Sequence, residues 1–470
     1  MEISSIQLSG RVGVAQGFSP AMFPYLLLLA LGPVSPIGAQ TAAQTAPGPT
    51  SPVRLTLNDA IARGHSASHR VGEFAARRDA NQAVVQVARS GLFPQVSALG
   101  GYTRTNHVDP FGILQPGAGL KVIYPDVPDN WRTRLDLQWS VYTGGRVDAF
   151  TRAAREDATA SVNDLAAVES DLRLEVTSAY WGAVTAREAV RVVGEALKRV
   201  DAQLADAQAR LRSGLVPPSD VTQAEARQAL QRTLLIEAQS GAESRLIALR
   251  RLIGLDQDVP LELVDPLTGP DSVLRDAAVL VEEARRGRPE RRALEARASS
   301  AAARRDAAAA GRKPQVFVAA GYDYAKPNPR IFPRADEWQQ SWDVGVNAAL
   351  TLFDGGRVRA EVASTDAVRR AADERLAEFD TLLEAEVRQA RLSVETSRAS
   401  LVSTREAVRS AAETHRVLRN RYTAGVATST EVLDAQVVQL QAELELTRAQ
   451  AQARLDEARL ERALGRESRQ

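Results

Sequence analysis

The sequence predicts a mixed α and β membrane protein with an internal duplication. Long segments rich in Ala, Arg, Glu, Leu and Gln are typical of long helices or coiled coils. Each half also contains two segments in which apolar and polar residues alternate, the pattern of a strand with two different faces. Three landmarks of the first half recur 211 residues later: 142–147 as 353–358, 213–215 as 424–426, and 252–254 as 463–465.

The composition excludes several classes of function. The 470 residues include 59 Lys and Arg against 58 Asp and Glu, which argues against a nucleic-acid partner held by a net basic field. The absence of cysteine excludes disulfides, zinc–thiolate sites and cysteine nucleophiles. No Ser/His/Asp grouping or phosphate-binding loop is found, so neither an enzyme nor a cofactor is predicted. His65 and His69 have metal-ligand spacing, but only Glu73 accompanies them, so exposed histidines are favoured and no metal site is predicted.

The amino terminus has the features of an export signal. Residues 21–31 form an apolar run of 11, too short to span a bilayer as a helix, and small residues before Gln40 provide a cleavage site. We therefore expect a signal peptide at 1–39 and a flexible mature start at 40–54. Met22 is an alternative start. Export places the mature chain outside the cytoplasm.

The mature chain divides into two repeats. We expect the first repeat at 55–254, a linker across the middle of the molecule at 255–275, the second repeat at 276–465 and a short tail at 466–470. Each repeat is expected to begin with a helix that ends just before a proline, because the residue preceding a proline disfavours helical geometry. These helices are predicted at 56–92 and 276–312.

Two strands follow in each repeat. They are predicted at 95–103 and 131–141, then at 315–324 and 342–352, separated by irregular loops at 104–130 and 325–338. Their length and alternation suit an outer-membrane barrel, although a soluble hairpin with one buried face has the same pattern. Trp-bearing apolar faces and the export signal favour the membrane interpretation. The expected lipid face comprises Trp131, Leu135, Leu137, Trp139, Trp342, Val344, Val346 and Leu350.

Four strands cannot close a membrane barrel, since the smallest have about eight. Unpaired strand edges are not viable in lipid, so the chain must oligomerise if these strands lie in a membrane. Three copies would supply twelve strands.

A very long helix follows each Gly-Gly-Arg turn. Residues 146–212 contain no proline, and 357–424 contain neither proline nor glycine. Each is expected to extend about 100 Å, the dimension of a rod or tunnel wall. Shorter return helices are predicted at 219–254 and 429–465, where narrow apolar stripes favour coiled-coil packing.

Together these motifs resemble the TolC-type family of outer-membrane efflux and secretion proteins. They comprise the Phe-Pro-Gln and Lys-Pro-Gln strand starts, the two Gly-Gly-Arg turns and the two helix tips, at 212–221 and 421–434. The resemblance implies a homotrimer with a 12-stranded β-barrel in outer-membrane lipid, four strands per chain, continued by an α-helical coiled-coil tunnel through the periplasm. It also implies two protein partners: a periplasmic adaptor (membrane fusion protein) and an inner-membrane pump of the resistance-nodulation-division or ABC type.

The helix tips contain the candidate gate. Glu431 and Asp434 begin a return helix and would form two carboxylate rings in a trimer, although acids also favour helix amino termini for their dipole. The resemblance implies that a tyrosine and an arginine close the pore against an aspartate. Tyr422 and Asp220 match that pattern, but Ala427 stands at the arginine position. Replacements are expected among Arg212, Arg419 and Arg421. The turns expected to dock the adaptor contain Gly214, Leu215, Val216, Gly425 and Val426.

The predicted function is a passive outer-membrane channel whose energy comes from the pump. A soluble periplasmic coiled-coil adaptor or scaffold is the alternative, which two equivalent halves with ten-residue strands disfavour. Drugs, metal ions and secreted proteins all remain open as cargo.

Overall fold

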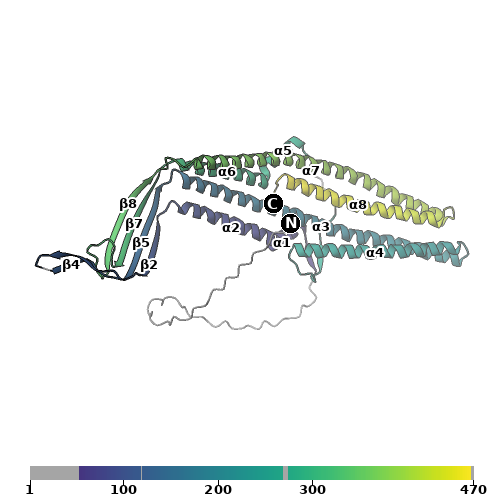
Figure 1. Cartoon of the computed structure of the whole chain (residues 1–470). Coiled ribbons are helices and arrows are strands. Elements are labelled where there is room, and N and C mark those ends of the chain that lie inside the picture. Colours follow the sequence, from purple (N-terminus) through teal and green to yellow (C-terminus); the bar gives the residue numbers. More distant parts are fainter. Residues whose placement is uncertain (1–51, 118, 268–273, 467–470) are drawn as a thin grey trace, which may run out of the picture. The chain divides into compact units, whose positions relative to one another are not determined.

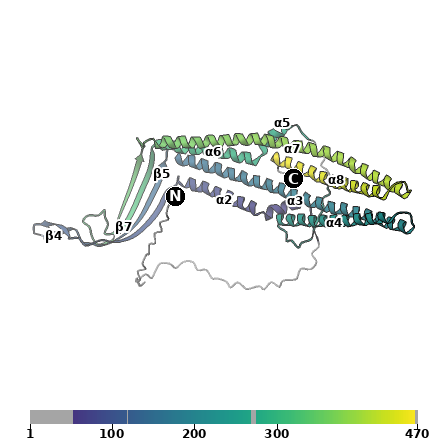
Figure 2. The same ribbon diagram turned by 45° about the vertical axis from the view of Figure 1, so that its right-hand side comes forward.

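The computed structural model describes residues 52–117, 119–267 and 274–466. The predicted signal peptide and most of the predicted flexible start therefore lie outside the described residues. A β-sheet lies at one end of the described chain, and long helices run from it side by side to a pair of helix tips (Figures 1 and 2). No helix in the described ranges is both long enough and apolar enough to cross a membrane.

The helices follow the predicted order. In the first half they are α1 (Leu57–Ala67), α2 (His69–Ser90), α3 (Arg146–Arg212) and α4 (Pro218–Leu252), and in the second half they are α5 (Ala277–Gly287), α6 (Pro289–Ala309), α7 (Arg357–Thr423) and α8 (Ser429–Ala463). The two long helices, α3 and α7, have 67 residues each and begin and end within a residue of the prediction. Both start after a turn whose two glycines have positive φ, between 64° and 87°, a region that non-glycine residues rarely adopt.

The prediction of one helix at the start of each half was wrong, because each of these segments contains two helices. Ser68 leaves helical geometry and its side chain accepts a hydrogen bond from Val71 N (3.3 Å), so it ends α1 and caps α2. Arg288 is held extended by the following proline and separates α5 from α6 without a capping hydrogen bond from its side chain. The break puts His65 and His69 on different helices, and His65 lies 3.1 Å from Glu169 instead.

The described residues form eight strands in three sheets: β1 (Val53–Leu55), β2 (Gln95–Arg104), β3 (Phe111–Gln115), β4 (Gly119–Tyr124), β5 (Asp129–Tyr142), β6 (Leu261–Leu263), β7 (Gln315–Lys326) and β8 (Gln339–Ala349). The main sheet is antiparallel with the order β2-β5-β7-β8, so β2 and β8 are its edges. Strands β1 and β6 pair in parallel near the middle of the molecule and were not predicted.

Two further strand predictions were wrong. The segment 104–130 is not irregular, since β3 and β4 form a hairpin within it. Strand β8 ends at Ala349, so the predicted lipid-facing Leu350 lies just beyond it. The last pair of the ladder joins Ala349 to Gln315, the first residue of β7, and the preceding Pro314 lacks an N–H that could extend the pairing.

The two long helices differ in the neighbours that cover them and in how much of their surface is buried. Helix α3 packs on α2 and α6 nearer the sheet and on α4 and α8 nearer the tip, whereas α7 packs on α5, α6 and α8. As a result α3 has 23 buried residues and α7, of equal length, has nine. The core of the first half includes Val176, Tyr180 and Trp181 of α3, and the Tyr180 hydroxyl donates to the carbonyl of Leu55 in β1 (3.1 Å).

Candidate functional site

The main sheet has one continuous apolar face. The register places Leu135 of β5 beside Tyr322 of β7, which in turn lies beside Trp342 of β8. One step along, Leu137 and Val344 flank Ala320 in the same way. Trp342, Val344 and Val346 are between 64% and 72% exposed, so this face has no partner among the residues that the structure describes. The predicted lipid-facing residues that lie in strands share this face; Leu350 alone follows the sheet.

Aromatic side chains mark the end of this face that lies away from the helices. Tyr102 packs on Trp131 with ring centroids 4.5 Å apart, and Tyr324 stacks on Trp338 at 4.9 Å. The Tyr102 hydroxyl donates to Asp129 Oδ1 (2.7 Å). Rings with one polar end are typical of a membrane–water boundary.

The opposite face of the sheet is charged. Asp323 of β7 is 1% exposed and accepts hydrogen bonds from Arg132 (2.6 Å) and Arg134 of β5. Arg134 also reaches Asp136 (2.6 Å) and Asp343 of β8 (3.4 Å). An apolar face backed by paired charges is the arrangement of a barrel wall with lipid outside and water inside.

The two helix tips have the same turn. Gly214 and Gly425 have φ of 70° and 76°, a left-handed conformation that ends the long helices α3 and α7. In each turn the following residue donates back to an arginine carbonyl: Leu215 N to Arg210 O and Val426 N to Arg421 O, both at 2.9 Å. Leu215 is 72% exposed and Val426 62%. The predicted docking residues therefore present two apolar tips to solvent.

The two candidate gate carboxylates differ. Glu431 forms a capping box with Thr428: its Oε2 accepts from the Thr428 N–H (2.7 Å), and its own N–H donates to Thr428 Oγ1 (3.3 Å). The hydrogen bonds that its carboxylate accepts from the Thr428 N–H and from the Thr428 hydroxyl (2.9 Å) lower the pKa of Glu431. The Asp434 side chain is 70% exposed, and a guanidinium nitrogen of Arg227 in α4 lies 3.8 Å from it. The Glu431 carboxylate is thus hydrogen-bonded within the helix end, whereas the Asp434 carboxylate is largely exposed beside Arg227.

Tyr422 of α7 joins the two tips through an arginine that the sequence analysis missed. The guanidinium of Arg210, in α3, lies 4.6 Å from the centre of the Tyr422 ring and donates to the Tyr422 carbonyl (3.3 Å). Arg210 is itself held by Asp206 (2.9 Å). Arg421 is one of the three arginines expected to replace the missing gate arginine. It occupies the position in the second repeat that Arg210 occupies in the first, 211 residues earlier, and this equivalence could have pointed to Arg210.

The predicted bond between Tyr422 and Asp220 is not formed in the described chain. The Tyr422 hydroxyl is buried near that of Ser429, and within the described residues neither has a hydrogen-bond partner of acceptable geometry. Burial, more than any nearby charge, raises the pKa of Tyr422. Arg210, and not Asp220, is therefore the group of α3 and α4 that contacts Tyr422 within one copy.

A layer of polar side chains lies farther from the tip than the contact between Arg210 and Tyr422. His415 of α7 is 8% exposed, beside the buried amides of Gln436 and Gln439 of α8. Burial lowers the pKa of His415 and keeps its ring neutral near pH 7. Arg199 of α3 pairs with Glu443 of α8 at 2.9 Å. Polar groups in a helical seam weaken its packing. The seam between α3, α7 and α8 is therefore polar here, in contrast to the apolar core of the first half.

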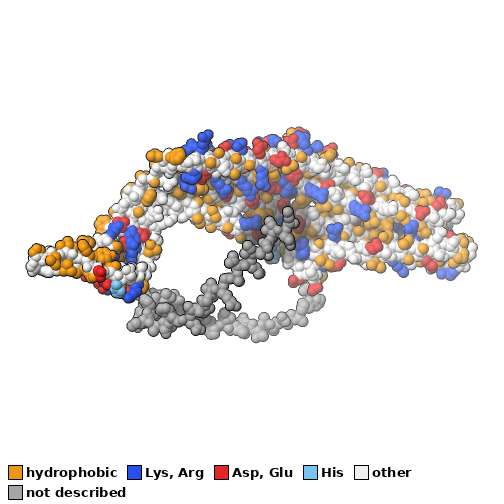
Figure 3. Space-filling model, in the orientation of Figure 1, with side chains coloured by type: hydrophobic (Ala, Val, Ile, Leu, Met, Phe, Trp, Pro, Cys, Tyr) orange, Lys and Arg blue, Asp and Glu red, His pale blue; other side chains and the backbone are white. Residues whose placement is uncertain are grey.

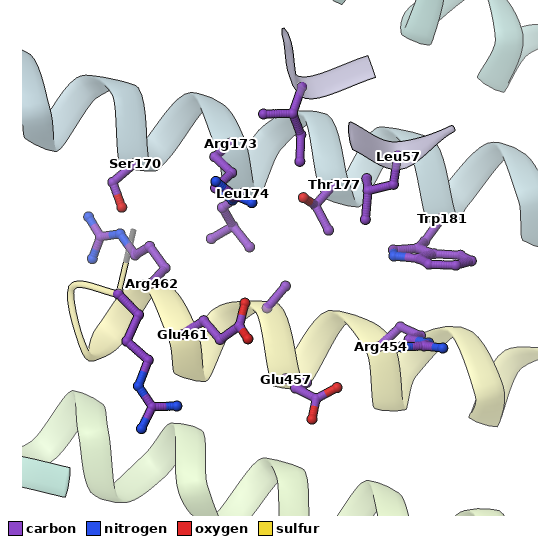
Figure 4. A pocket seen from close by; sticks show the side chains of 13 residues that line it. Leu57, Ser170, Arg173, Leu174, Thr177, Trp181, Arg454, Glu457, Glu461 and Arg462 are labelled. Carbon is purple, nitrogen blue, oxygen red and sulfur yellow. The ribbon is translucent and has the colours of Figure 1, made fainter. Parts of the chain in front are cut away.

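A cavity of about 170 Å³ lies between α3 and α8, with Arg173 and Trp181 on one wall and Glu457 and Glu461 on the other (Figure 4). Burial raises the pKa of Glu461, and the negative charge of Glu457 adds to this rise. Ligand pockets usually have about 300–1,000 Å³. This space is therefore too small for a typical organic substrate.

Comparison with known proteins gives concordant matches. The family model described as outer membrane efflux protein matches residues 63–255 and 280–466. Protein CyaE of Bordetella pertussis is 30% identical over 307 residues, 64% of this chain and 61% of CyaE. The chain thus spans less than two thirds of that relative.

Two solved structures share the fold. The outer membrane protein VceC of Vibrio cholerae has a TM-score of 0.73 at 22% identity, covering 87% of this chain and 96% of VceC. The MtrE outer membrane channel of Neisseria gonorrhoeae, described in its open state, has a TM-score of 0.71 at 20% identity, covering 87% of this chain and 88% of MtrE.

Proposed function

Because this chain belongs to the outer membrane efflux protein family, we propose that three copies of it close into a passive channel through the outer membrane and the periplasm. Each copy would contribute β2, β5, β7 and β8 to a twelve-stranded barrel. The long helices and their return helices would form the wall of a tunnel beneath it. The two halves, 55–254 and 276–465, would be equivalent units around the axis.

The observation that carries this proposal is the exposed second stripe of α7. Its buried residues, among them Leu383, Val387 and Val394, recur at spacings of three and four and face the same chain. Exposed apolar residues form another stripe with heptad spacing. Leu382 and Val417 follow Val368 by 14 and 49 residues, which are multiples of seven, and Leu392 follows Val368 by 24 residues, or three heptads plus three. On a heptad wheel this stripe lies nearly opposite the buried one. A helix with apolar stripes on opposite sides suits a position inside a wall.

The matching surface lies on the other edge of the same chain. Helices α2 and α4 flank α3 there and expose apolar side chains that no described part of the same copy covers. These side chains are Val84 and Val87 of α2 and Leu230, Leu234, Ile236 and Ile247 of α4. We infer that α7 of one copy packs on α2 and α4 of the next, while β8 pairs with the neighbouring β2.

The soluble adaptor is not supported, because the family match covers both repeats and the apolar sheet face is uncovered across residues 52–117, 119–267 and 274–466. A channel of this kind conducts substrates passively to the outside of the cell, and a different protein supplies the energy for transport. We propose that the tips around Leu215 and Val426 dock a periplasmic adaptor, which connects the channel to an inner-membrane pump. Recording single channels in planar bilayers tests the proposal: stable ion conductance is expected, and a protein that never conducts would refute it.

The contact between Arg210 and Tyr422 is the proposed latch of the closed tip. Arg210→Ala removes a cation–π contact and a charge-assisted hydrogen bond in each copy, together about 1–3 kcal/mol of closed-state stability. The open fraction in bilayer recordings is expected to rise at least about tenfold. Arg212→Ala is the matched control, since Arg212 is exposed at the same tip. Equal open fractions for the two variants would contradict the latch.

Asp434 is the proposed selectivity residue. Asp434→Asn removes three exposed carboxylates from the narrow end of a trimer, so the preference for cations over anions is expected to fall several-fold. Glu431→Gln is the informative comparison, because the Glu431 carboxylate is occupied by Thr428. It is expected to change selectivity less than Asp434→Asn. Reversal potentials in a salt gradient measure both, and an unchanged value for Asp434→Asn would remove the assignment.

A further inference from the structure

The hairpin of β3 and β4 has an apolar surface that no other part of the described chain covers. It projects beyond the strand ends that lie away from the helices (Figures 1 and 2). Lys121 is its one charged residue between Phe111 and Tyr124. Six of its seven large apolar side chains are 40–78% exposed, and Leu114 is the most exposed of them. A two-stranded ribbon is marginal in water by itself, and so large an apolar surface indicates a partner.

Lipid is a poor partner for this hairpin, because charges separate it from the apolar face of the sheet. Arg104 pairs with Asp129 at 3.0 Å where β2 and β5 end, and His107 pairs with Asp126 at 2.6 Å where the hairpin begins. Arg104 and His107 are largely exposed, and their aspartate partners are partly exposed. Figure 3 shows hydrophobic side chains covering the hairpin, with charged side chains and a histidine at its base. Ionised groups are costly inside a bilayer, so they mark its boundary and leave the hairpin in water outside.

The base of the hairpin is fixed by the second half of the chain. Arg334, between β7 and β8, donates its backbone N–H to the Ile123 carbonyl (3.2 Å) and bonds to the Tyr124 hydroxyl. Its guanidinium lies 4.8 Å from the centre of the Tyr124 ring. The hairpin is therefore held at its root while its length remains unsupported. The corresponding segment of the second half, 327–338, contains no strand, so each copy has one such hairpin in its described residues.

We propose that the hairpins of the three copies pack against one another over the outer mouth of the barrel. The occupant of the apolar surface is thus a second copy of this chain, and the inference rests on the proposed trimer. Twelve strands about 4.8 Å apart and tilted by about 40° give a barrel radius of about 12 Å. Strands of five and six residues reach about 16–20 Å, which is enough to meet at the axis. Continuity with the edge strand β2 places every hairpin at a junction between copies.

The chain has no cysteine, so single cysteines can report this contact. Leu114→Cys in the assembled channel is expected to give covalent dimers on oxidation or with a short bismaleimide, leaving one thiol in three unpaired. Phe332→Cys is the control, because Phe332 is 70% exposed but lies outside the hairpin. It is expected to stay monomeric on denaturing gels.

Two outcomes would overturn the inference. If Leu114→Cys fails to cross-link within an intact trimer, the hairpins do not meet, and the channel proposal stands. If Leu114→Trp fluorescence is quenched by brominated lipids, the hairpin lies in the membrane and not against its copies. Loss of the trimer itself in the wild-type chain would remove both proposals, and measuring mass in detergent separates that case from the first.

Discussion

The double variant Leu382→Glu and Leu392→Glu is expected to abolish assembly of the trimer. Both leucines lie in the exposed stripe of α7 and are 57% and 53% exposed in one copy. In the trimer they would be buried against α2 and α4 of the neighbour. A carboxylate buried without a partner costs several kcal/mol, and the trimer contains six of them. Light scattering after chromatography in detergent should find single copies.

A matched variant separates this effect from general damage to the helix. Ala407→Glu introduces the same charge into α7 at an exposed position outside both apolar stripes. It should assemble as the wild-type chain does. The helical content of all variants, measured by circular dichroism, should be equal. A double variant that remains trimeric would show that α7 does not face the next copy.

Val346→Arg is expected to prevent stable insertion into the outer membrane. Val346 is 72% exposed near the middle of the apolar face of β8. An arginine on the lipid face near the bilayer midplane costs about 2–4 kcal/mol, so three copies lose about 6–12 kcal/mol. The membrane fraction that resists urea extraction should fall to near background.

The adjacent residue provides the control for this prediction. Asn347 lies next to Val346 but on the opposite, charged face of the sheet. Asn347→Arg would point into water and should insert almost normally. If the two variants were extracted to the same extent, the assignment of the two faces would be wrong.

Much of this architecture could be predicted from the sequence because the periodicities are long. The alternation through Trp131 and Trp139 located β5 within two residues of its ends, and proline-free stretches located α3 and α7. The hairpin was missed because its turn lies in the Pro/Gly-rich run Gln115–Gly119, and its strands are too short for a secure period. The end of β8 is set by the residue at which its neighbour β7 begins. The alternation of side chains within β8 carries no information about that residue.

The candidate site was less predictable, because its contacts join residues about 200 positions apart. Asp434 and Glu431 were identified together, but only the structure separates them, through the bond of Glu431 to Thr428. Arg210 was overlooked because its proximity to Tyr422 depends on how the tips of α3 and α7 pack. Local patterns therefore located the tips, and tertiary packing decided the role of each side chain.

The central claim is that one copy is an incomplete wall and that three copies complete it. Native mass spectrometry of the wild-type protein in detergent tests this most directly. The expected result is a single species with three times the mass of the mature chain. A monodisperse single copy, stable in buffer without detergent and unable to bind lipid vesicles, would contradict it.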